Sequence, residues 1–270
     1  MYDKIFLVLF MELKEIERSI IKKYRKTIFG PFVKAINEFE LIEPNDKIAI
    51  CISGGKDSFL LAKCMQEIKR HGKFDFELEF IVMNPGYAKE NIEKIKENLD
   101  KLGIIAHIFD AKIFEFADTT ENPCYMCAKM RRGNLYAFAK ELGCNKIALG
   151  HHFNDVIETV LMNMLFNGTF SSMMPKIKSD NFENMYLIRP LYYVKEEDII
   201  KWAKYNELEF LDCACSVTKK SIGTRKVIKD LVKDLNKIYS KADVNILTST
   251  KNVNLNTILS YKKGDKNHNF

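Results

Sequence analysis

The sequence has no apolar run long enough to cross a membrane. Its best candidate, residues 5–11, falls far short of the ~20 residues that a membrane-spanning helix needs. It also lacks the basic start and the small-residue cleavage site of a secretory signal. Cysteine is scarce and odd in number, with seven among 270 residues, which argues against a disulfide framework. We therefore expect a cytoplasmic protein without membrane association, in which some cysteines act as ligands or redox groups.

The first four fifths of the chain have no excess of positive charge. Residues 1–212 carry thirty basic and thirty-two acidic side chains, whereas residues 213–270 carry twelve Lys and Arg against four Asp. A basic end of this kind is a plausible footprint for a nucleic-acid backbone. It is equally compatible with a solvated, lysine-rich helix. We expect the polar end, Lys262–Phe270, to be disordered.

No internal repeat is present, and strands alternate with helices through the middle of the chain. This alternation predicts an α/β fold, a parallel sheet with helices on both faces and helical additions at both ends. We expect three parts: an N-terminal helical segment (1–44), a nucleotide-binding domain (45–212) and a basic C-terminal segment with its tail (213–270). The expected strands are 47–52, 77–83, 104–109, 145–149, 186–188 and one near 208–211, and the expected helices between them are 57–71, 89–103, 128–143, 154–167 and 195–206. Helical periodicity also marks 12–40, with a break at Gly30-Pro31, and 224–239, while 114–123 and 167–184 look like loops.

The first strand of this pattern ends in a glycine-bearing turn that opens a helix. Ile48 to Ile52 form the apolar run of a strand covered on both faces. Gly54 and Gly55 let the backbone turn and approach a ligand closely. The helix N-terminus that follows would attract phosphate, Lys56 adds a cation, and Asp57 could hold the magnesium that accompanies nucleotide phosphates. The spacing is not that of a Walker A loop, which needs four residues between its glycine and the Gly-Lys pair.

Ligands of a parallel sheet bind at the carboxyl ends of its strands. This places the loop Ser53–Ser58, the turn after Met83, and Gly150 at one rim. His151 and His152 follow at the same rim. For both we favour hydrogen bonding to backbone or phosphate over proton transfer.

Two cysteines, Cys124 and Cys127, precede the helix expected at 128–143. Two thiols three residues apart at the start of a helix can face one metal, and Arg131 and Arg132 would favour their thiolate forms. The pair alone could be a redox pair, half of a zinc site, a cluster site or a coincidence. Cys213 and Cys215 could complete a zinc site, but their spacing is tight for one tetrahedral ion. Three cysteines around an iron–sulfur cluster fit better if the third is Cys213. The remaining cysteines, Cys51, Cys64 and Cys144, lie in apolar runs and are expected in the core.

Four strings carry a resemblance to a known family: Ile52-Ser-Gly-Gly-Lys-Asp-Ser58, Cys124-Tyr-Met-Cys-Ala-Lys-Met-Arg-Arg-Gly-Asn-Leu-Tyr136, Lys146-Ile-Ala-Leu-Gly-His-His-Phe-Asn-Asp155 and Ile188-Arg-Pro-Leu191. The first resembles the PP-loop of the ATP pyrophosphatase superfamily, whose fold is Rossmann-like. Together they resemble the TtcA family, the tRNA 2-thiocytidine synthetases, over residues 28 to 239. The resemblance implies an enzyme that uses ATP, Mg²⁺ and a [4Fe–4S] cluster. Such an enzyme adenylates the C2 carbonyl of a tRNA cytidine in the anticodon loop and replaces its oxygen with sulfur.

The resemblance also implies roles for single residues. Ser53, Gly54, Gly55, Lys56, Asp57 and Ser58 would bind the pyrophosphate end of ATP, with Asp57 taking part in catalysis. Met83, Arg131, Gly150 and Asp155 would approach the nucleotide. Cys124, Cys127 and Cys213 would hold the cluster and take part in sulfur transfer. The chain departs from the family at Asn154, where a second acid is common. It also departs at the last cysteine pair, which leaves Cys215 as a substitute for Cys213.

The implied partners are tRNA and a sulfur donor, either a cysteine desulfurase or sulfide, with a homodimer as a further expectation. Two other enzyme functions remain open at this point. One is a PP-loop ligase or amidotransferase-type enzyme with a structural zinc site, and the other is a thiolase of a different tRNA pyrimidine. A sulfur-carrying or nucleotide-sensing binding protein is the alternative outside enzymes.

Overall fold

The computed structural model describes residues 11–72, 75–111, 113, 123–211, 218–264 and 266–269. The chain divides into two compact units, residues 1–155 with 174–223, and residues 156–173 with 224–270. The three-part division expected from the sequence stays a prediction. None of the described helices combines the length and the apolar character that crossing a bilayer requires.

The first unit is built on a six-stranded sheet with the order β3-β2-β1-β4-β6-β5. All neighbours are parallel except β5 and β6, which pair antiparallel at one edge. The prediction of a parallel α/β sheet is therefore confirmed, with one antiparallel edge strand added. The strands are β1 (Lys47–Ile52), β2 (Glu77–Asn84), β3 (His107–Asp110), β4 (Lys146–Ala148), β5 (Lys176–Lys178) and β6 (Tyr186–Ile188).

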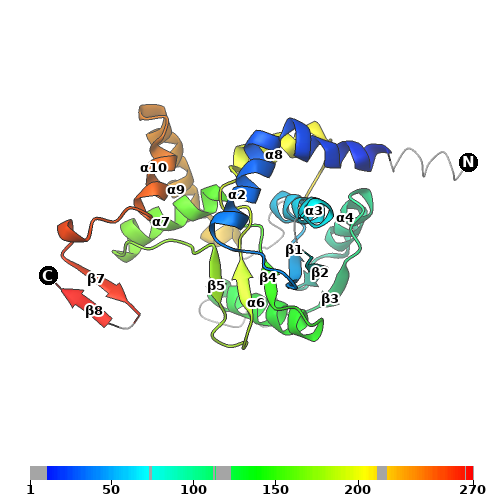
Figure 1. Cartoon of the computed structure of the whole chain (residues 1–270), viewed down its shortest axis with the longest axis horizontal. Helices are drawn as coiled ribbons and strands as arrows, with labels where there is room; N and C mark the ends of the chain where they lie inside the picture. The colour runs from blue at the N-terminus through cyan, green and yellow to red at the C-terminus, as the bar shows by residue number, and fades with distance from the viewer. Residues whose placement is uncertain are drawn as a thin grey trace, which may run out of the picture. The chain divides into compact units, whose positions relative to one another are not determined.

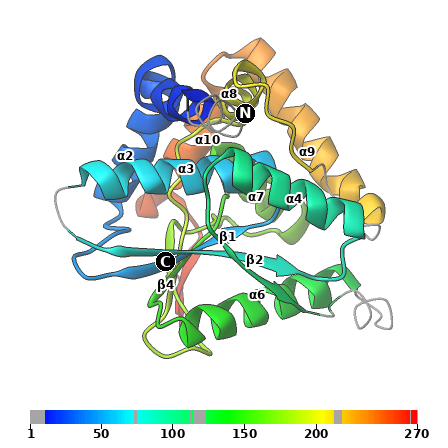
Figure 2. The ribbon, with the colours of Figure 1, turned by 90° about the vertical axis from the view of Figure 1, so that its right-hand side faces the viewer.

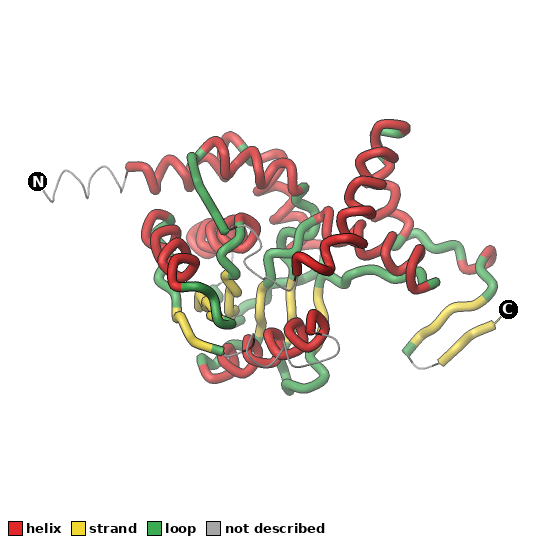
Figure 3. The backbone as a smooth tube through the Cα atoms, turned by 180° about the vertical axis from the view of Figure 1, so that it is seen from behind, coloured by secondary structure: helices red, strands yellow, loops and turns green. Residues whose placement is uncertain are grey.

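Helices cover both faces of this sheet, as Figure 2 shows for α3 and α4 on one face and α6 on the other. The alternation of helices and strands can be followed along the chain in Figures 1 and 3. Because β1 lies between two neighbours and two layers of helices, five of its six residues are buried. The helices of the first unit are η1 (Ser19–Lys23), η2 (Arg25–Phe29), α2 (Gly30–Glu38), α3 (Lys56–His71), α4 (Lys89–Lys101), α6 (Pro123–Glu141) and α8 (Glu196–Tyr205). Helix α7 (Phe153–Asn167) begins in the first unit and belongs to the second from residue 156 onward.

The N-terminal helical segment changes its hydrogen bonding where the sequence predicts a break. Residues 11–18 are α-helical, η1 and η2 are π-helical, and α2 begins at Gly30 with Pro31 in its first turn. Proline is tolerated there because the first amides of a helix have no partner within it.

Two expectations for the first unit were wrong. Residues 208–211 form no strand, because the backbone amide of Leu211 donates to the carbonyl oxygen of Gly54 instead of to a neighbouring strand. The stretch 167–184, expected as a loop, contains the edge strand β5. Three residues are too few to produce a readable alternation of apolar and polar side chains.

The second unit contains α9 (Thr218–Ile238) from residue 224 onward, α10 (Ala242–Ser249), η3 (Leu255–Thr257) and a hairpin of β7 (Ser260–Lys263) and β8 (Lys266–Asn269). An ion pair joins Arg225 of α9 to Glu158 of α7, with 3.1 Å between Nε and Oε2. The expectation of a disordered tail was wrong. The hairpin pairs Tyr261 with His268, whose rings stack with centroids 4.7 Å apart.

A buried ion pair gives a prediction for stability. Lys146 is 1% exposed, and its Nζ lies 2.6 Å from Oδ2 of Asp46, whose side chain is 4% exposed. Lys146→Met would leave the Asp46 carboxylate buried without its cationic partner. We therefore expect the free energy of unfolding to fall by about 3 to 5 kcal/mol in a urea titration. The control is Lys176→Met. Lys176 pairs with the more exposed Glu43, so we expect a loss of about 1 kcal/mol or less. Equal losses in the two variants would contradict this account.

Candidate functional site

A cavity of about 390 Å³ lies at the carboxyl ends of β1, β2 and β4. The chain proceeds from β1 to β2 on one side and reaches β4 on the other, so β1 and β4 flank a topological switch point. Ligands of open α/β sheets bind at such points. The cavity is lined by Cys51, Ile52, Ser53, Asp57, Ser58, Met83, Tyr87, Arg131, Leu135, Leu149, Gly150, His151 and Asp155.

The loop between β1 and α3 is held in a fixed shape by its own hydrogen bonds. Gly54 has φ +92°, a conformation that favours glycine. The Ser58 hydroxyl donates to the carbonyl oxygen of Gly55 at 2.8 Å and accepts from the Ser53 amide at 3.2 Å. The amides of Ser58 and Phe59 donate to the carbonyl oxygen of Gly55, and the amides of Lys56 and Asp57 precede them at the start of this sixteen-residue helix, where an anion can bind.

Lys56 lies between two carboxylates. Its Nζ is 3.2 Å from Oδ1 of Asp57 and 3.3 Å from Oε1 of Glu196. Burial lowers the pKa of Lys56, but the two carboxylates outweigh burial and the net pKa is raised. The lysine is therefore a cation at neutral pH, and it can pass from carboxylate to phosphate when a nucleotide enters.

Asp57 and Asp155 face each other across His152. His152 is 6% exposed, its Nε2 lies 3.8 Å from Oδ1 of Asp57, and its Nδ1 lies 3.4 Å from Oδ2 of Asp155. Burial raises the pKa of Asp57, while His152 and Lys56 act in the opposite direction. Two carboxylates beside a phosphate loop are oxygen donors of the kind that Mg²⁺ prefers.

Cys127 lies one helical turn before Arg131 on α6, so the two side chains share a face of that helix. Arg131 and Met83 line the cavity, and Cys127 packs in a small apolar cluster with Met83, Ala111 and Ile113. Cys127 is 8% exposed. The cysteine predicted as a ligand thus belongs to the same apolar cluster as Met83, which lines the nucleotide cavity.

The structure brings together most of the predicted site. Ser53, Asp57, Ser58, Met83, Arg131, Gly150 and Asp155 all line the cavity, and Gly54, Gly55 and Lys56 form the loop beside it. The side chain of Cys124 lies outside the described residues, as do Cys213 and Cys215. Among the described residues, no three His, Cys, Asp or Glu side chains are grouped as metal ligands.

Three neighbours of this site had no role predicted from the sequence. Glu196 pairs with Lys56 from 140 residues away, and Arg189 contacts His151. The Asn154 carboxamide oxygen accepts from the Glu196 amide at 3.0 Å at the start of α8. Arg189 and Asn154 lie in strings that carry the family resemblance, whereas Glu196 gave no signal in the sequence.

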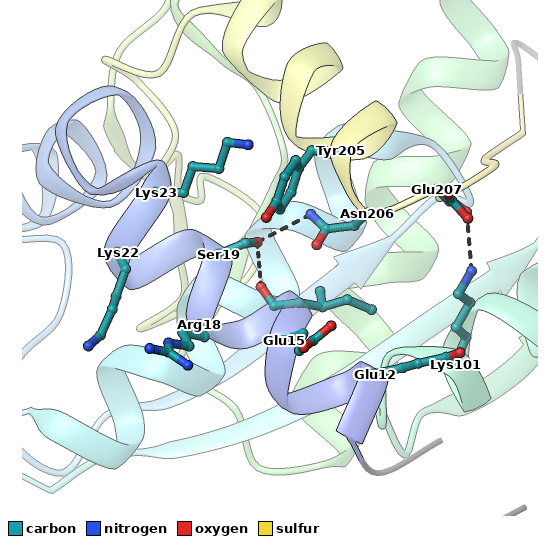
Figure 4. A pocket seen from close by; sticks show the side chains of 11 residues that line it. Glu12, Glu15, Arg18, Ser19, Lys22, Lys23, Lys101, Tyr205, Asn206 and Glu207 are labelled. Atoms are coloured by element: carbon teal, nitrogen blue, oxygen red, sulfur yellow. Dashed lines mark hydrogen bonds between the residues drawn. The ribbon is translucent and has the colours of Figure 1, made fainter. Parts of the chain in front are cut away.

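A larger cavity of about 610 Å³ lies elsewhere in the first unit, against residues 12–23 and the ends of α4 and α8 (Figure 4). Its side chains pair among themselves: Asn206 donates to the Ser19 hydroxyl and Lys101 donates to the carbonyl oxygen of Glu207. Of the residues that the structure describes, no cysteine and no strand end lines this cavity. Size alone therefore does not identify the functional site, and the smaller cavity carries the chemistry.

Comparison with known proteins agrees with this assignment. A family profile described as a PP-loop domain matches residues 25–232. The tRNA-cytidine(32) 2-sulfurtransferase of Neisseria meningitidis is 35% identical over 247 residues, covering 89% of this chain and 75% of that protein. The enzyme of the same name from Geobacter metallireducens is 35% identical over 86% of this chain and 91% of its own length. This chain belongs to the TtcA family.

The fold is shared with a solved tRNA thiolase. The U34-tRNA thiolase NcsA from Methanococcus maripaludis, solved with its [4Fe-4S] cluster, matches with a TM-score of 0.67 at 24% identity. The match covers 82% of this chain and 76% of NcsA. The PP-loop match contains every residue that lines the smaller cavity.

The close approach at Gly150 gives a test of the nucleotide site. A Cβ atom there would lie 3.0 Å from the carbonyl carbon of Asp57 and from the Ser58 amide nitrogen, both backbone atoms. We expect Gly150→Ala to push β4 and the loop apart and to weaken ATP binding about tenfold, as measured by calorimetry. Gly133→Ala is the control, because a Cβ there meets nothing within 4 Å. Unchanged ATP affinity in Gly150→Ala would mean that this contact does not shape the nucleotide site.

Proposed function

We propose that this protein is an ATP-dependent tRNA sulfurtransferase that converts a cytidine of the anticodon loop, at position 32 as in its relatives, to 2-thiocytidine. The observation that carries the proposal is that Met83, which lines the nucleotide cavity, packs in one apolar cluster with Cys127. A phosphate loop and a thiol within one site are what the two halves of the reaction need: activation of a carbonyl and delivery of sulfur.

In the first half, the C2 oxygen of the base attacks the α-phosphorus of ATP, and the bond from that phosphorus to the bridging oxygen breaks. Pyrophosphate leaves, and the open amides at the start of α3 together with Lys56 stabilise its charge. Asp57 and Asp155 are the residues that would hold Mg²⁺. In the second half, sulfide attacks C2, the bond from C2 to the adenylated oxygen breaks, and that oxygen leaves with AMP.

The residues at the start of α6 fit an iron–sulfur cluster. Cys124 and Cys127 are the second and fifth residues of this helix, near the end where the helix dipole favours thiolate. Cys213 is the proposed third ligand. It follows two residues after Leu211, and the backbone amide of Leu211 donates to the carbonyl oxygen of Gly54 in the phosphate loop. When bound, the cluster supplies a soft iron site for sulfide.

The substrate class agrees with the charge of the second unit. Its residues, 156–173 and 224–270, carry ten Lys and Arg against five Asp and Glu, a balance that suits a tRNA backbone. A single-stranded anticodon loop also lets the target base leave its stack and enter a cavity. We further propose a cysteine desulfurase or sulfide as the sulfur donor, a homodimer, and a cytoplasmic location alongside tRNA.

Mass spectrometry of tRNA nucleosides tests the function. A strain lacking this gene should lose 2-thiocytidine and regain it on complementation. Loss of a thiolated uridine instead would move the target to another pyrimidine, and an unchanged nucleoside profile would exclude the proposed activity. Anaerobically purified protein should contain iron and sulfide, whereas colourless protein with zinc would support a structural metal site.

A further inference from the structure

His151 and Arg189 form a pair at the rim of the nucleotide cavity. His151 follows the end of β4 and lines the cavity, and Arg189 follows the end of β6. Their strands are neighbours, with Ala148 opposite Ile188, so both side chains emerge at one edge of the sheet. The Nε atom of Arg189 lies 3.3 Å from Nδ1 of His151.

Arg189 is fixed from two further directions. Its guanidinium donates to the carbonyl oxygen of Met174, and its backbone amide donates to the carbonyl oxygen of Pro175 at 2.9 Å. The residue is 7% exposed. Burial, followed by the nearby charge of Arg132, lowers the pKa of Arg189 to about 10. The guanidinium is therefore protonated at neutral pH, and its Nε–H can only donate.

This contact decides the protonation state of His151. Because Nε of Arg189 donates, Nδ1 of His151 must accept, and the proton of the neutral ring lies on Nε2. A general base needs an unprotonated ring nitrogen aimed at its substrate. Here one nitrogen is occupied by the guanidinium and the other already carries a proton.

We propose that His151 is a neutral hydrogen-bond donor, through Nε2–H, to the phosphates of the bound nucleotide, and that Arg189 is the positioning residue that fixes this tautomer. The proposal deepens the proposed function and rests on it for the identity of the nucleotide. Gly150, the preceding residue, packs on the backbone of Asp57 and Ser58 at the start of α3, and His151 lines the same cavity as those two residues. Phosphate oxygens are acceptors only, which suits a ring that can only donate at Nε2.

His152 has a different task. It is buried between Asp57 and Asp155, and its backbone amide donates to Oδ2 of Asp155 at 3.0 Å. The adjacent histidines thus have different roles. His152 lies between the two carboxylates that would hold Mg²⁺, and His151 donates to the phosphates.

Two substitutions of His151 separate its ring nitrogens. The glutamine side chain places its amide nitrogen near the position of Nε2, whereas the asparagine side chain places it near Nδ1. We expect His151→Gln to keep AMP formation within about tenfold of the parent and His151→Asn to lose about 10²-fold, mainly in kcat, as for loss of one preorganised donor. Equal activities in the two variants would overturn the donor role.

The tautomer itself can be read without tRNA, cluster or turnover. In ¹⁵N-histidine NMR spectra of the full chain, which has five histidines, the His151→Gln variant identifies the signals of His151. We expect protonated Nε2 and unprotonated Nδ1 in the parent, a shift of the Nε2 signal with a non-hydrolysable ATP analogue, and a mixture of tautomers in Arg189→Met. A parent ring protonated at Nδ1 would overturn the proposal, even if Arg189→Met does not fold. Because this measurement needs no thiolation, its outcome is independent of the proposed tRNA chemistry.

Discussion

Asp57→Asn is expected to lower the rate of tRNA thiolation by at least about 10³-fold. The Asp57 carboxylate lines the cavity, holds Lys56 at 3.2 Å, and would supply a negative oxygen to Mg²⁺. The amide keeps the shape of the side chain but loses its charge. Loss of a metal that stabilises the leaving pyrophosphate costs several kcal/mol in the transition state, and about 4 kcal/mol corresponds to 10³-fold. Pyrophosphate release with tRNA present measures the effect directly.

The same substitution should not unfold the protein, which makes the activity loss interpretable. Since burial raises the pKa of Asp57, the folded state binds its proton more tightly than the unfolded state does. Stability is therefore lost as pH rises from the ordinary pKa through the raised one, because the buried carboxyl group then ionises. We expect Asp57→Asn to be as stable as the parent or more stable. The matched control is Asp75→Asn, an exposed aspartate that pairs with Lys69, and it should leave activity unchanged. If the Asp57→Asn variant were both inactive and unfolded, the loss of activity would indicate a structural role for Asp57 and would contradict this prediction.

The phosphate loop could be predicted from the sequence because all of its signals are local. An apolar run, two glycines and the start of a helix lie within sixteen residues of one another. Together, in this order, they indicate a strand, a turn and a helix. The contacts that complete the site are not local. Lys56 meets Glu196, and His151 meets Arg189, only because β4 and β6 are adjacent in the sheet and α8 follows β6. No periodicity in the sequence encodes that adjacency.

The wrong strand at 208–211 shows how apolar residues can mislead. Phe210 stacks on Phe59 with ring centroids 5.3 Å apart and lies near Trp202, so it is apolar for packing reasons. Leu211 then turns its backbone toward the phosphate loop. Its side chain would meet a Cβ on Gly54 at 2.8 Å. Burial by helices gives the same short apolar run as burial within a sheet.

The C-terminal hairpin was missed for the opposite reason. Its strands are almost entirely polar and carry Lys262, Lys263 and Lys266. Such a composition is typical of a disordered tail. The stacked rings of Tyr261 and His268, which face each other across the two strands, supply a cross-strand contact that favours pairing.

Cys127→Ser is expected to abolish thiolation and to remove the iron from anaerobically purified protein, while ATP affinity stays within about twofold of the parent. Cys127 packs in the apolar cluster that includes Met83 and is not among the described residues that line the nucleotide cavity, so we expect its loss to leave the nucleotide contacts unchanged. The serine side chain is only slightly smaller than that of cysteine and also carries a polar atom, but its hydroxyl oxygen is a poor ligand for iron in a site built for thiolates. Iron and sulfide analysis, nucleoside mass spectrometry and calorimetry with ATP make the three measurements on one preparation.

The control for this substitution is Cys144→Ala. Cys144 is 5% exposed in the core cluster with Cys51 and Ile147, and burial raises its pKa to about 11. That thiol is therefore protonated at neutral pH and unsuited to a metal. Cys144→Ala should retain iron and thiolation even if it unfolds at a lower temperature. If Cys127→Ser kept its iron, the ligands would have to be other cysteines. If it lost ATP binding as well, the thiol and the nucleotide could not have the separate roles that adenylation followed by sulfur transfer requires.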